Sequence, residues 1–266
     1  MLECVINISE GRDVATLAAL TDAAGADLLD MHTDAHHHRS VLTVAGVEAP
    51  RRVATVAIDR IDLRTHVGVH PRLGAVDVVP FVALADCTPN EAIRARDEFA
   101  SWLAATHGVP CFLYGTERSL PDVRRGAFEG LRPDLGPPDP HPTAGATAVG
   151  ARGPLVAYNV WLGQDLAIAR QVARSVRGPH LRALGLAVGG RVQVSMNLIR
   201  PDELGPAEAY DRVADMAASA GAAVDGAELV GLIPASVLAM VPRERWAMLD
   251  LAEDRTIEAR LDVRRS

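Results

Sequence analysis

The chain has 266 residues, 48% of them hydrophobic, which suffices for one large or two modest domains with buried cores. The formal net charge of -7 is carried by dispersed acidic residues, no run of arginines forms a basic stripe, and aromatic residues make up 4%, so a nucleic-acid-binding surface is not expected. The sequence shows no N-terminal leader pattern and no apolar stretch near the ~20 residues that span a bilayer. It therefore predicts a cytoplasmic protein without membrane contact.

All 27 basic residues are arginines, and the chain contains no lysine. Lysine Schiff bases, lysine general bases and a P-loop lysine are excluded, so anions must be held by arginines, helix N-termini or backbone amides. The three cysteines, Cys4, Cys87 and Cys111, lie in apolar contexts without CxxC spacing. This predicts buried free thiols rather than a disulfide framework or a thiolate zinc site.

Hydrophobic periodicity predicts the order β-α-β-β-α-β in the first part of the chain. The expected strands are 2–8, 27–32, 40–45 and 75–82, and the expected helices are 14–24 and 52–61. The run Thr88-Pro89-Asn90-Glu91 is a capping box with proline at the first helical position, which predicts a helix that extends to His107. A strand is expected at 109–114.

Residues 134–145, DLGPPDPHPTAG, contain too much proline and glycine for a helix or strand. This loop carries His141 and Thr143 and continues into ATAVGAR, where Gly150 and Arg152 directly precede the next predicted strand. It is either a linker that only sets spacing or a binding loop at a cleft between two domains.

The same order of elements recurs after Arg152. The expected strands are 155–162, 181–188, 191–198 and 223–232, the expected helices are 165–176 and 207–220, and a final helix of mixed charge is expected at 242–266. The Gly189-Gly190 pair suits a tight hairpin. Two units with this order predict an α+β fold of two ferredoxin-like (β-α-β-β-α-β) subdomains with mixed or antiparallel sheets, 1–152 and 153–266.

The segment RTHVGVHPRLGAVDVVPF, residues 64–81, places titratable side chains on a glycine- and proline-containing loop before a buried strand, which is a typical site position. Pro71 ends any helix at His70. An imidazole titrates near ~6.5, so His70 can take and return a proton at neutral pH, or it merely satisfies a loop carbonyl. Arg72 suits a bidentate contact with a carboxylate.

A second polar cluster lies between two expected strands. It consists of Asp30, His32, Asp34, His36, His37, His38 and Arg39. The pairs His32 with His36 and His66 with His70 are imaginable zinc or iron ligands. Neither pair lies on a predicted helix and no HExxH pattern occurs, so no metal is expected. The remaining alternative is a solvated histidine-rich turn without a role.

Eight motifs together resemble one known family. They are ECVINISEGRD at 3–13, DxHTDAxHxRSV at 30–41, HPRLGAVDVVPF at 70–81, FLYG at 112–115, GPxxxHPTAGATAVGAR at 136–152, LVAYNVWL at 155–162, VQVSMNL at 192–198 and ELVGLIP at 228–234. In this order, over nearly the whole chain, they are similar to the motifs of glutamate formiminotransferase, also called glutamate formimidoyltransferase.

The resemblance implies transfer of the formimino group from N-formimino-L-glutamate to tetrahydrofolate, within histidine degradation. It implies two subdomains that enclose a folate tunnel, a homodimer, small-molecule substrates only, and tetrahydrofolate as co-substrate. The catalytic histidine of the family motif corresponds to His70, and the folate-binding loop to residues 136–145. The expected substrate- and folate-binding residues are Gly136, Pro137, His141, Thr143, Gly145, Arg39, Arg72, Arg152, His32 and Asp34.

Two positions depart from the family pattern: His38 stands where relatives tend to have asparagine, and Trp161 replaces a polar residue. The chain ends before the helical domain that gives bifunctional relatives cyclodeaminase activity, so a monofunctional enzyme is expected. Three alternatives stay open. They are a reduced-folate-binding protein without turnover, a metal-dependent hydrolase that uses the histidines, and formyl rather than formimino transfer.

Overall fold

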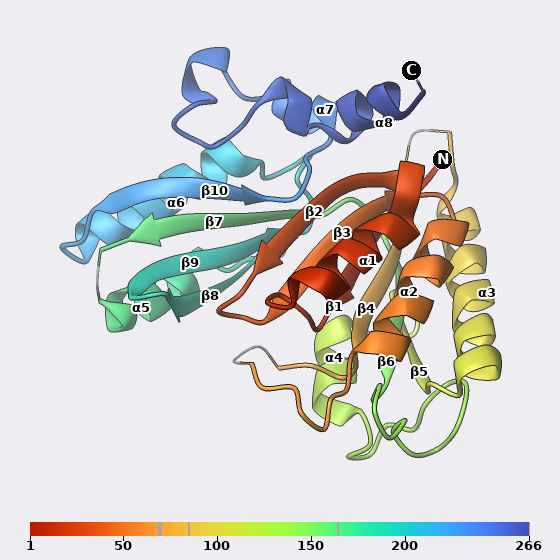
Figure 1. Ribbon diagram of the computed structural model, residues 1–266. Helices are drawn as coiled ribbons and strands as arrows, with labels where there is room; N and C mark the ends of the chain where they lie inside the picture. Colours follow the sequence, from red (N-terminus) through yellow and green to blue (C-terminus); the bar gives the residue numbers. More distant parts are fainter. Residues whose placement is uncertain (69–70, 85, 164, 266) are drawn as a thin grey trace. The chain divides into compact units, whose positions relative to one another are not determined.

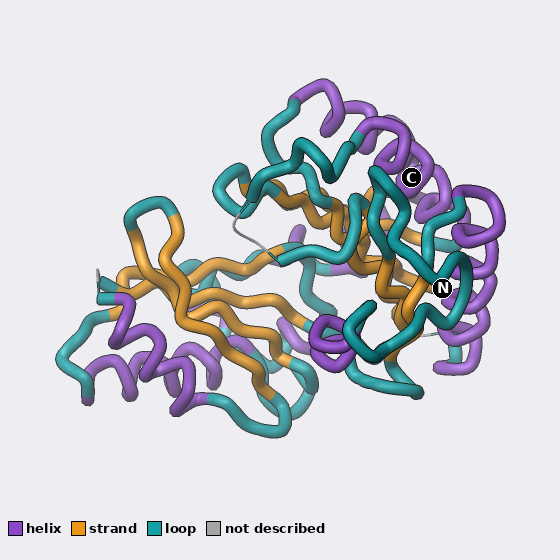
Figure 2. Tube along the Cα trace, turned by 90° about the horizontal axis from the view of Figure 1, so that it is seen from below, coloured by secondary structure: helices purple, strands orange, loops and turns teal. Residues whose placement is uncertain are grey.

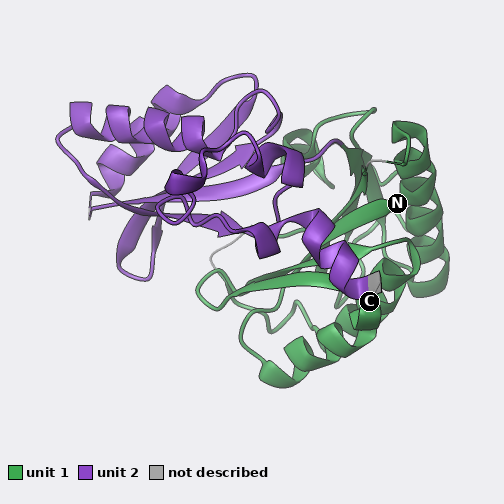
Figure 3. Cartoon of the chain, turned by 90° about the horizontal axis from the view of Figure 1, so that it is seen from above, with its two compact units in different colours: residues 1–152 green, residues 153–266 purple. Residues whose placement is uncertain are grey.

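The computed structural model describes residues 1–68, 71–84, 86–163 and 165–265. The chain falls into two compact units, Met1–Arg152 and Gly153–Ser266, drawn in green and purple (Figure 3). In the described ranges, no helix combines the length and the apolar character that crossing a membrane requires.

The first unit contains a ferredoxin-like arrangement. Its elements are β1 (Leu2–Ile8), α1 (Val14–Ala24), a 3-10 turn (Gly25–Asp27), β2 (Leu28–Asp34), β3 (Arg39–Ala45), α2 (Glu48–Arg60) and β4 (Val76–Ala83). These four strands are antiparallel in the order β2-β3-β1-β4. The order agrees with the predicted split βαβ topology.

The chain then adds two parallel strands to the sheet. The added elements are α3 (Pro89–His107), β5 (Cys111–Tyr114), α4 (Leu120–Gly126) and β6 (Thr147–Arg152). β6 pairs in parallel with β4 on one side and β5 on the other, which gives the order β2-β3-β1-β4-β6-β5. The sheet therefore has one strand more than the five predicted for this part of the chain, because the 147–152 segment was interpreted as a connection.

Local signals explain the elements that the sequence predicts well. Asp13 caps α1 by accepting from the backbone N–H of Ala15 and Thr16, and Thr88 and Glu91 form the expected capping box of α3. β6 carries no such signal, because it is buried and rich in small residues. At Gly150 a Cβ would lie 2.1 Å from Tyr114 Cζ, so only glycine fits beside this ring.

Helices α1, α2 and α3 pack on one face of the six-stranded sheet (Figure 1). A smaller apolar cluster lies on the other face, where Val123 of α4 meets Phe112, Tyr114 and Ala148. β1, β3 and their neighbours alternate between these faces. The side chains that alternate with this core, among them Asn7, His32 and Arg39, therefore point away from the helix layer.

The second unit is a four-stranded ferredoxin-like unit. Its elements are β7 (Val156–Leu162), α5 (Leu166–Val176), β8 (Leu181–Val188), β9 (Arg191–Leu198), α6 (Pro206–Ser219) and β10 (Val224–Val230). The antiparallel order is β10-β7-β9-β8, and α5 and α6 cover one face (Figure 2). The predicted pair of ferredoxin-like subdomains is confirmed.

The C-terminal segment differs from its prediction as one helix over 242–266. It forms α7 (Ala235–Leu238), two 3-10 turns (Arg243–Arg245 and Glu253–Arg255) and α8 (Ile257–Arg265). Asp250 adopts a positive φ of 54°, which interrupts a helix. Leu249 is buried and its carbonyl accepts from Tyr158 Oη at 2.9 Å, so core packing prevails over helix propensity here.

Candidate functional site

His70, the expected base, and Val69 lie outside the described residues. The chain on both sides of them is described, up to Gly68 and again from Pro71. These two flanks, and the segments that contact them, therefore define the surroundings of the HPR motif.

The HPR segment and the glycine- and proline-rich loop are joined directly. Gly74 and Gly145 form an antiparallel bridge. Three backbone hydrogen bonds of 2.8–2.9 Å extend it, from Ala75 N to Ala144 O, Ala146 N to Leu73 O and Leu63 N to Thr143 O. Gly145 has φ +70°, and a Cβ there would lie 2.3 Å from Leu73 O. Two motifs that are far apart in the sequence thus share one place in the fold.

Within the loop, the His141 ring has a structural contact. Its Nδ1 accepts from the backbone N–H of Ala144 at 3.0 Å and of Thr143 at 3.3 Å, and backbone bonds with Gly145 close the turn. Nε2 is therefore the ring nitrogen that suits a contact with a ligand. Gly136, with φ +87°, packs close to Pro110 and Ala104, and Pro137 is exposed.

A buried carboxylate stands at the start of β4. Asp77 is 1% exposed. Its Oδ1 accepts from Leu73 N at 2.7 Å, and Arg124 Nη2 donates to Oδ2 at 2.6 Å. Arg124 Nη1 donates to Pro71 O at 3.2 Å. Arg124 of α4 thereby links the flank after His70 to a fixed negative charge.

Arg39 lies on the other side of this carboxylate. Its Nη1 is 3.9 Å from Asp77 Oδ2, and its Nη2 donates to Asn7 Oδ1. Burial lowers the pKa of Arg39 to about 10; Asp77 opposes this effect and Arg124 adds to it. Two guanidinium groups therefore face one carboxylate, a local positive excess in an acidic protein. This arrangement suits the binding of an anionic substrate.

Arg72 has a role within its own loop. Its Nη2 donates to Gly68 O at 2.6 Å, so the guanidinium connects the flank after His70 with the flank before it. Burial lowers the pKa of Arg72, against the opposing charge of Asp77. At least one of its donors thus serves the loop rather than the expected carboxylate clamp.

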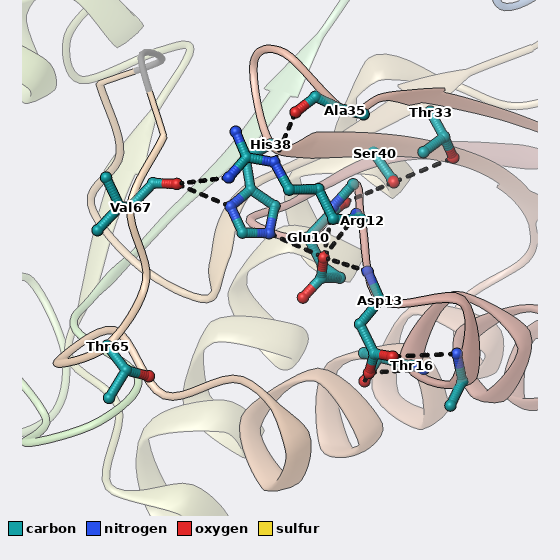
Figure 4. A network of polar contacts seen from close by, with 12 residues as sticks. Glu10, Arg12, Asp13, Thr16, Thr33, Ala35, His38, Ser40, Thr65 and Val67 are labelled. Atoms are coloured by element: carbon teal, nitrogen blue, oxygen red, sulfur yellow. Dashed lines mark hydrogen bonds and ion pairs between the residues drawn. The ribbon is translucent and has the colours of Figure 1, made fainter.

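Glu10 holds one end of the histidine cluster through His38 (Figure 4). The His38 ring contacts Glu10 Oε1 through Nε2 and Val67 O through Nδ1, both at 2.9 Å. The His66 ring stacks on it with a centroid distance of 3.9 Å. Arg12 donates to Ala35 O at 2.7 Å and to Val67 O at 3.3 Å. The His66 ring thus lies against His38; the imagined metal pair of His66 with His70 is not tested, because His70 lies outside the described residues.

Asp34 is bound within its own turn. Its Oδ2 is 2.6 Å from His37 Nδ1, and its Oδ1 accepts from two backbone N–H groups. Burial alone raises the pKa of this carboxyl, but the hydrogen bonds and the charge of His37 lower it overall. His32 lies opposite Val41 on the neighbouring strand, and Asp34 lies opposite Arg39. His32, Asp34 and Arg39 therefore share one face of the sheet.

Arg152 lies apart from the other arginines. It pairs with Val82 across β6 and β4, five positions beyond Asp77 and so roughly 16 Å further along the strand. It neighbours Tyr114, whose pKa burial raises to about 12 against the opposing effect of Arg152. The structure thus groups Arg39 and Arg72 near Asp77 but leaves Arg152 at the other end of β4.

No group of three or more His, Cys, Asp or Glu side chains in the described part of the chain has the arrangement of a metal site.

The sequence analysis did not identify three residues that hold the candidate site together: Glu10, Arg12 and Arg124. Glu10 and Arg12 lie in the motif ECVINISEGRD, but a buried glutamate after a strand gives no specific signal. Arg124 lies on α4, a short helix that was not predicted. It is adjacent to Arg125, and the sequence does not distinguish the half-buried partner of Asp77 from the exposed arginine. A recognisable capping box at Ser119 and Asp122 was the one signal that could have located this helix.

Comparison with known proteins gives consistent results. Residues 1–152 match the family model described as formiminotransferase domain, N-terminal subdomain. The chain is similar to the glutamate formimidoyltransferase of Streptococcus pyogenes serotype M1, with 37% identity over 90% of each chain. It is 30% identical to the glutamate formimidoyltransferase of Thermoplasma acidophilum over 98% of this chain and 97% of the relative. It is 34% identical over its whole length to the formimidoyltransferase-cyclodeaminase of Dictyostelium discoideum, of which the match spans 56%.

Proposed function

The chain belongs to the formiminotransferase family, and we propose that it transfers the formimino group of N-formimino-L-glutamate to tetrahydrofolate. The products are 5-formiminotetrahydrofolate and L-glutamate. The observation that carries this proposal is the 37% identity to a glutamate formimidoyltransferase over 90% of both chains. The 30% identity to a second enzyme of this name over 97% of its length supports it.

We propose His70 as the group that moves protons. Formimino transfer requires N5 of the folate to attack the amidine carbon and lose a proton, after which the glutamate nitrogen leaves with one. One base that returns its proton serves both steps. The motif HPRLGAVDVVPF is intact at residues 70–81. The bonds that hold Val67, Pro71 and Leu73 on either side support this role, because a proton shuttle needs a fixed backbone.

The anionic groups of both substrates need cationic partners. Arg39 and Arg72 are proposed as holders of the donor carboxylates, since Arg39 lies 3.9 Å from Asp77 and the charge of Asp77 also acts on Arg72. Residues 136–145, with His141 and Thr143, are proposed as the folate contact because the Gly74–Gly145 bridge joins this loop to the HPR segment. Arg152, His32 and Asp34 are also proposed as substrate contacts. Arg152 lies at the other end of β4, and Asp34 is bound within its own turn. His32 is supported only by its place on the same sheet face as Arg39.

The proposals on the subdomains, the folate tunnel, the compartment and the oligomeric state are based on membership of the family. We propose that units 1–152 and 153–266 are the two formiminotransferase subdomains, that they enclose the folate tunnel, and that the protein is a cytoplasmic homodimer. Light scattering of the purified protein tests the dimer, and a structure with a folate analogue tests the tunnel.

The decisive experiment incubates the purified protein with formiminoglutamate and tetrahydrofolate and measures glutamate release and 5-formiminotetrahydrofolate together. Omission of either substrate is the control, and N-formylglutamate as donor separates formyl from formimino transfer. Stoichiometric formation of both products is expected. Tight folate binding without glutamate release would instead establish a binding protein, and loss of a hydrolytic activity on chelation would favour the metal-dependent alternative.

A further inference from the structure

The His38 ring makes two hydrogen bonds to groups that can only accept. Nε2 faces Glu10 Oε1 and Nδ1 faces the carbonyl oxygen of Val67, both at 2.9 Å (Figure 4). A carbonyl oxygen and an ionised carboxylate carry no hydrogen to donate. Both bonds therefore exist together only when each ring nitrogen carries a hydrogen, that is, when His38 is an imidazolium.

Glu10 supplies the negative charge for this bond. It is 8% exposed, and its Oε1 also accepts from the backbone N–H of Gly11, Arg12 and Asp13 at 2.7–3.0 Å. Burial raises the pKa of this carboxyl, but the backbone donors and the His38 ring lower it overall. A charge-assisted bond to such a carboxylate is stronger than a neutral one.

The other groups around the ring fix the same segment. Arg12 Nη1 donates to Val67 O at 3.3 Å, beside the His38 contact. Arg72 Nη2 donates to Gly68 O at 2.6 Å. The His66 ring stacks on His38, and both of its buried nitrogens have no hydrogen-bond partner among the described residues. The two arginines thus hold the carbonyls of Val67 and Gly68 next to the ring, and His66 contributes by stacking.

The backbone geometry shows that this contact is specific. His38 has φ +54°, a conformation that side chains with a Cβ rarely adopt. At Gly68 a Cβ would lie 2.9 Å from His38 Cβ and 3.0 Å from Arg72 Nη2. The close approach of the two segments therefore depends on a glycine on one side and an unusual backbone on the other.

We infer that His38 is a positioning residue for the proposed transfer: its ring ties Val67 to Glu10 and so anchors the chain that leads into His70. The inference rests on the proposed function. The flank after His70 has separate anchors, because Arg124 binds Pro71 O and Asp77 accepts from Leu73 N. His38 anchors the flank before it, together with the bonds of Arg12 and Arg72 to Val67 O and Gly68 O, so its loss should lower turnover more than substrate affinity.

The test compares His38→Gly with His36→Ala. Glycine adopts the positive φ readily, so this variant removes the side chain without adding backbone strain. His36 is an exposed neighbour in the same turn and serves as the control. In His38→Gly, amide hydrogen exchange of residues 65–68 should become at least about tenfold faster, and kcat should fall about 10- to 100-fold. The KM values for both substrates should change less than about twofold. His36→Ala should match the unchanged protein.

A conservative variant completes the test. His38→Asn retains a side-chain N–H donor and tolerates a positive φ, so it should recover part of kcat and of the exchange protection. Unchanged exchange in His38→Gly would overturn the anchor, and a rise in KM without a fall in kcat would overturn the positioning role. If the unchanged protein shows no transfer, the proposed function and the catalytic part of this inference fail, while the exchange result still decides whether the anchor exists.

Discussion

The guanidinium of Arg124 donates to both oxygens of the Asp77 carboxylate, at 2.6 and 3.3 Å, across 47 positions of sequence. The same guanidinium donates to Pro71 O. Through Arg124, α4 therefore contacts the start of β4 and holds the HPR segment in place. Because Asp77 is buried, its charge depends on this partner.

Arg124→Gln should lower the free energy of unfolding by about 2–4 kcal/mol, because it leaves a buried carboxylate without its main cation. The neighbouring Arg125 is the matched control. Its side chain is 71% exposed and pairs with Asp122 at the surface, so Arg125→Gln should cost no more than about 0.5 kcal/mol. Urea unfolding at neutral pH measures both. Equal stabilities of the two variants would show that the pair of Arg124 with Asp77 does not contribute to the free energy of unfolding.

Gly145→Ala should disrupt the junction between the HPR segment and the 136–145 loop. A Cβ there meets Leu73 O at 2.3 Å in a backbone with φ +70°. Gly108 has a similar φ of +64° but nothing within 4 Å of a Cβ. Gly108→Ala should therefore cost only the backbone penalty of about 1–2 kcal/mol, and Gly145→Ala about 1–3 kcal/mol more. Thermal and urea unfolding give the difference, and equal losses would contradict the close contact.

Helices α1 and α3, each of which begins at a capping residue, were predicted from the sequence with correct bounds. β1 and α1 have the predicted bounds, and α3 begins at the proline of its capping box. β6 was missed because small residues buried on both faces leave no alternation. The pairing of Glu10 with His38 spans 28 positions, and that of Asp77 with Arg124 is longer still. Such pairs are created by the sheet order, so periodicity along one chain does not reveal them.

The family motifs located the segments of the candidate site, which hydrophobic periodicity alone does not do. They selected the HPR segment and the 136–145 loop, which the structure joins through Gly74 and Gly145. They did not indicate which side chains hold these segments, because Arg12 and Arg124 act through backbone carbonyls. A motif identifies a residue type at a position, whereas a hydrogen bond to a carbonyl depends only on where the backbone passes.

Glu10→Gln should change the acid dependence of stability. The folded-state pKa of Glu10 lies below its ordinary value of 4.5, so its stabilising effect is fully present above pH 4.5 and is lost as the pH falls through the folded-state pKa. The variant should be about 2 kcal/mol less stable at pH 7, and this difference should shrink below pH 4.5. Urea unfolding across this range tests it, with exposed Glu129→Gln as control. A constant difference at all pH values would contradict the prediction.

Arg72→Ala should affect both kinetic constants. The carboxylate contact expected of Arg72 alone would chiefly raise the KM for formiminoglutamate, but Arg72 also bonds Gly68 O at 2.6 Å. We expect KM to rise about tenfold, the equivalent of about 1.4 kcal/mol, together with a lower kcat because the flanks of His70 lose their mutual contact. Arg64→Ala, on the same segment but 68% exposed and paired with Asp62, should alter neither. A fall in kcat at constant KM would assign Arg72 to loop structure alone.

His70→Ala should abolish most of the turnover while leaving the fold intact. A proton shuttle contributes about 10²- to 10⁴-fold, so kcat should fall by this factor with little change in KM, since the imidazole acts on the reacting atoms rather than on substrate capture. The pH dependence of kcat should lose the limb that reports the free base. His36→Ala controls for removal of a nearby histidine. Arg124, Arg72 and His38 hold the flanks through other bonds, so the His70→Ala variant should keep the local fold, and near-normal turnover would remove His70 from the role of proton shuttle.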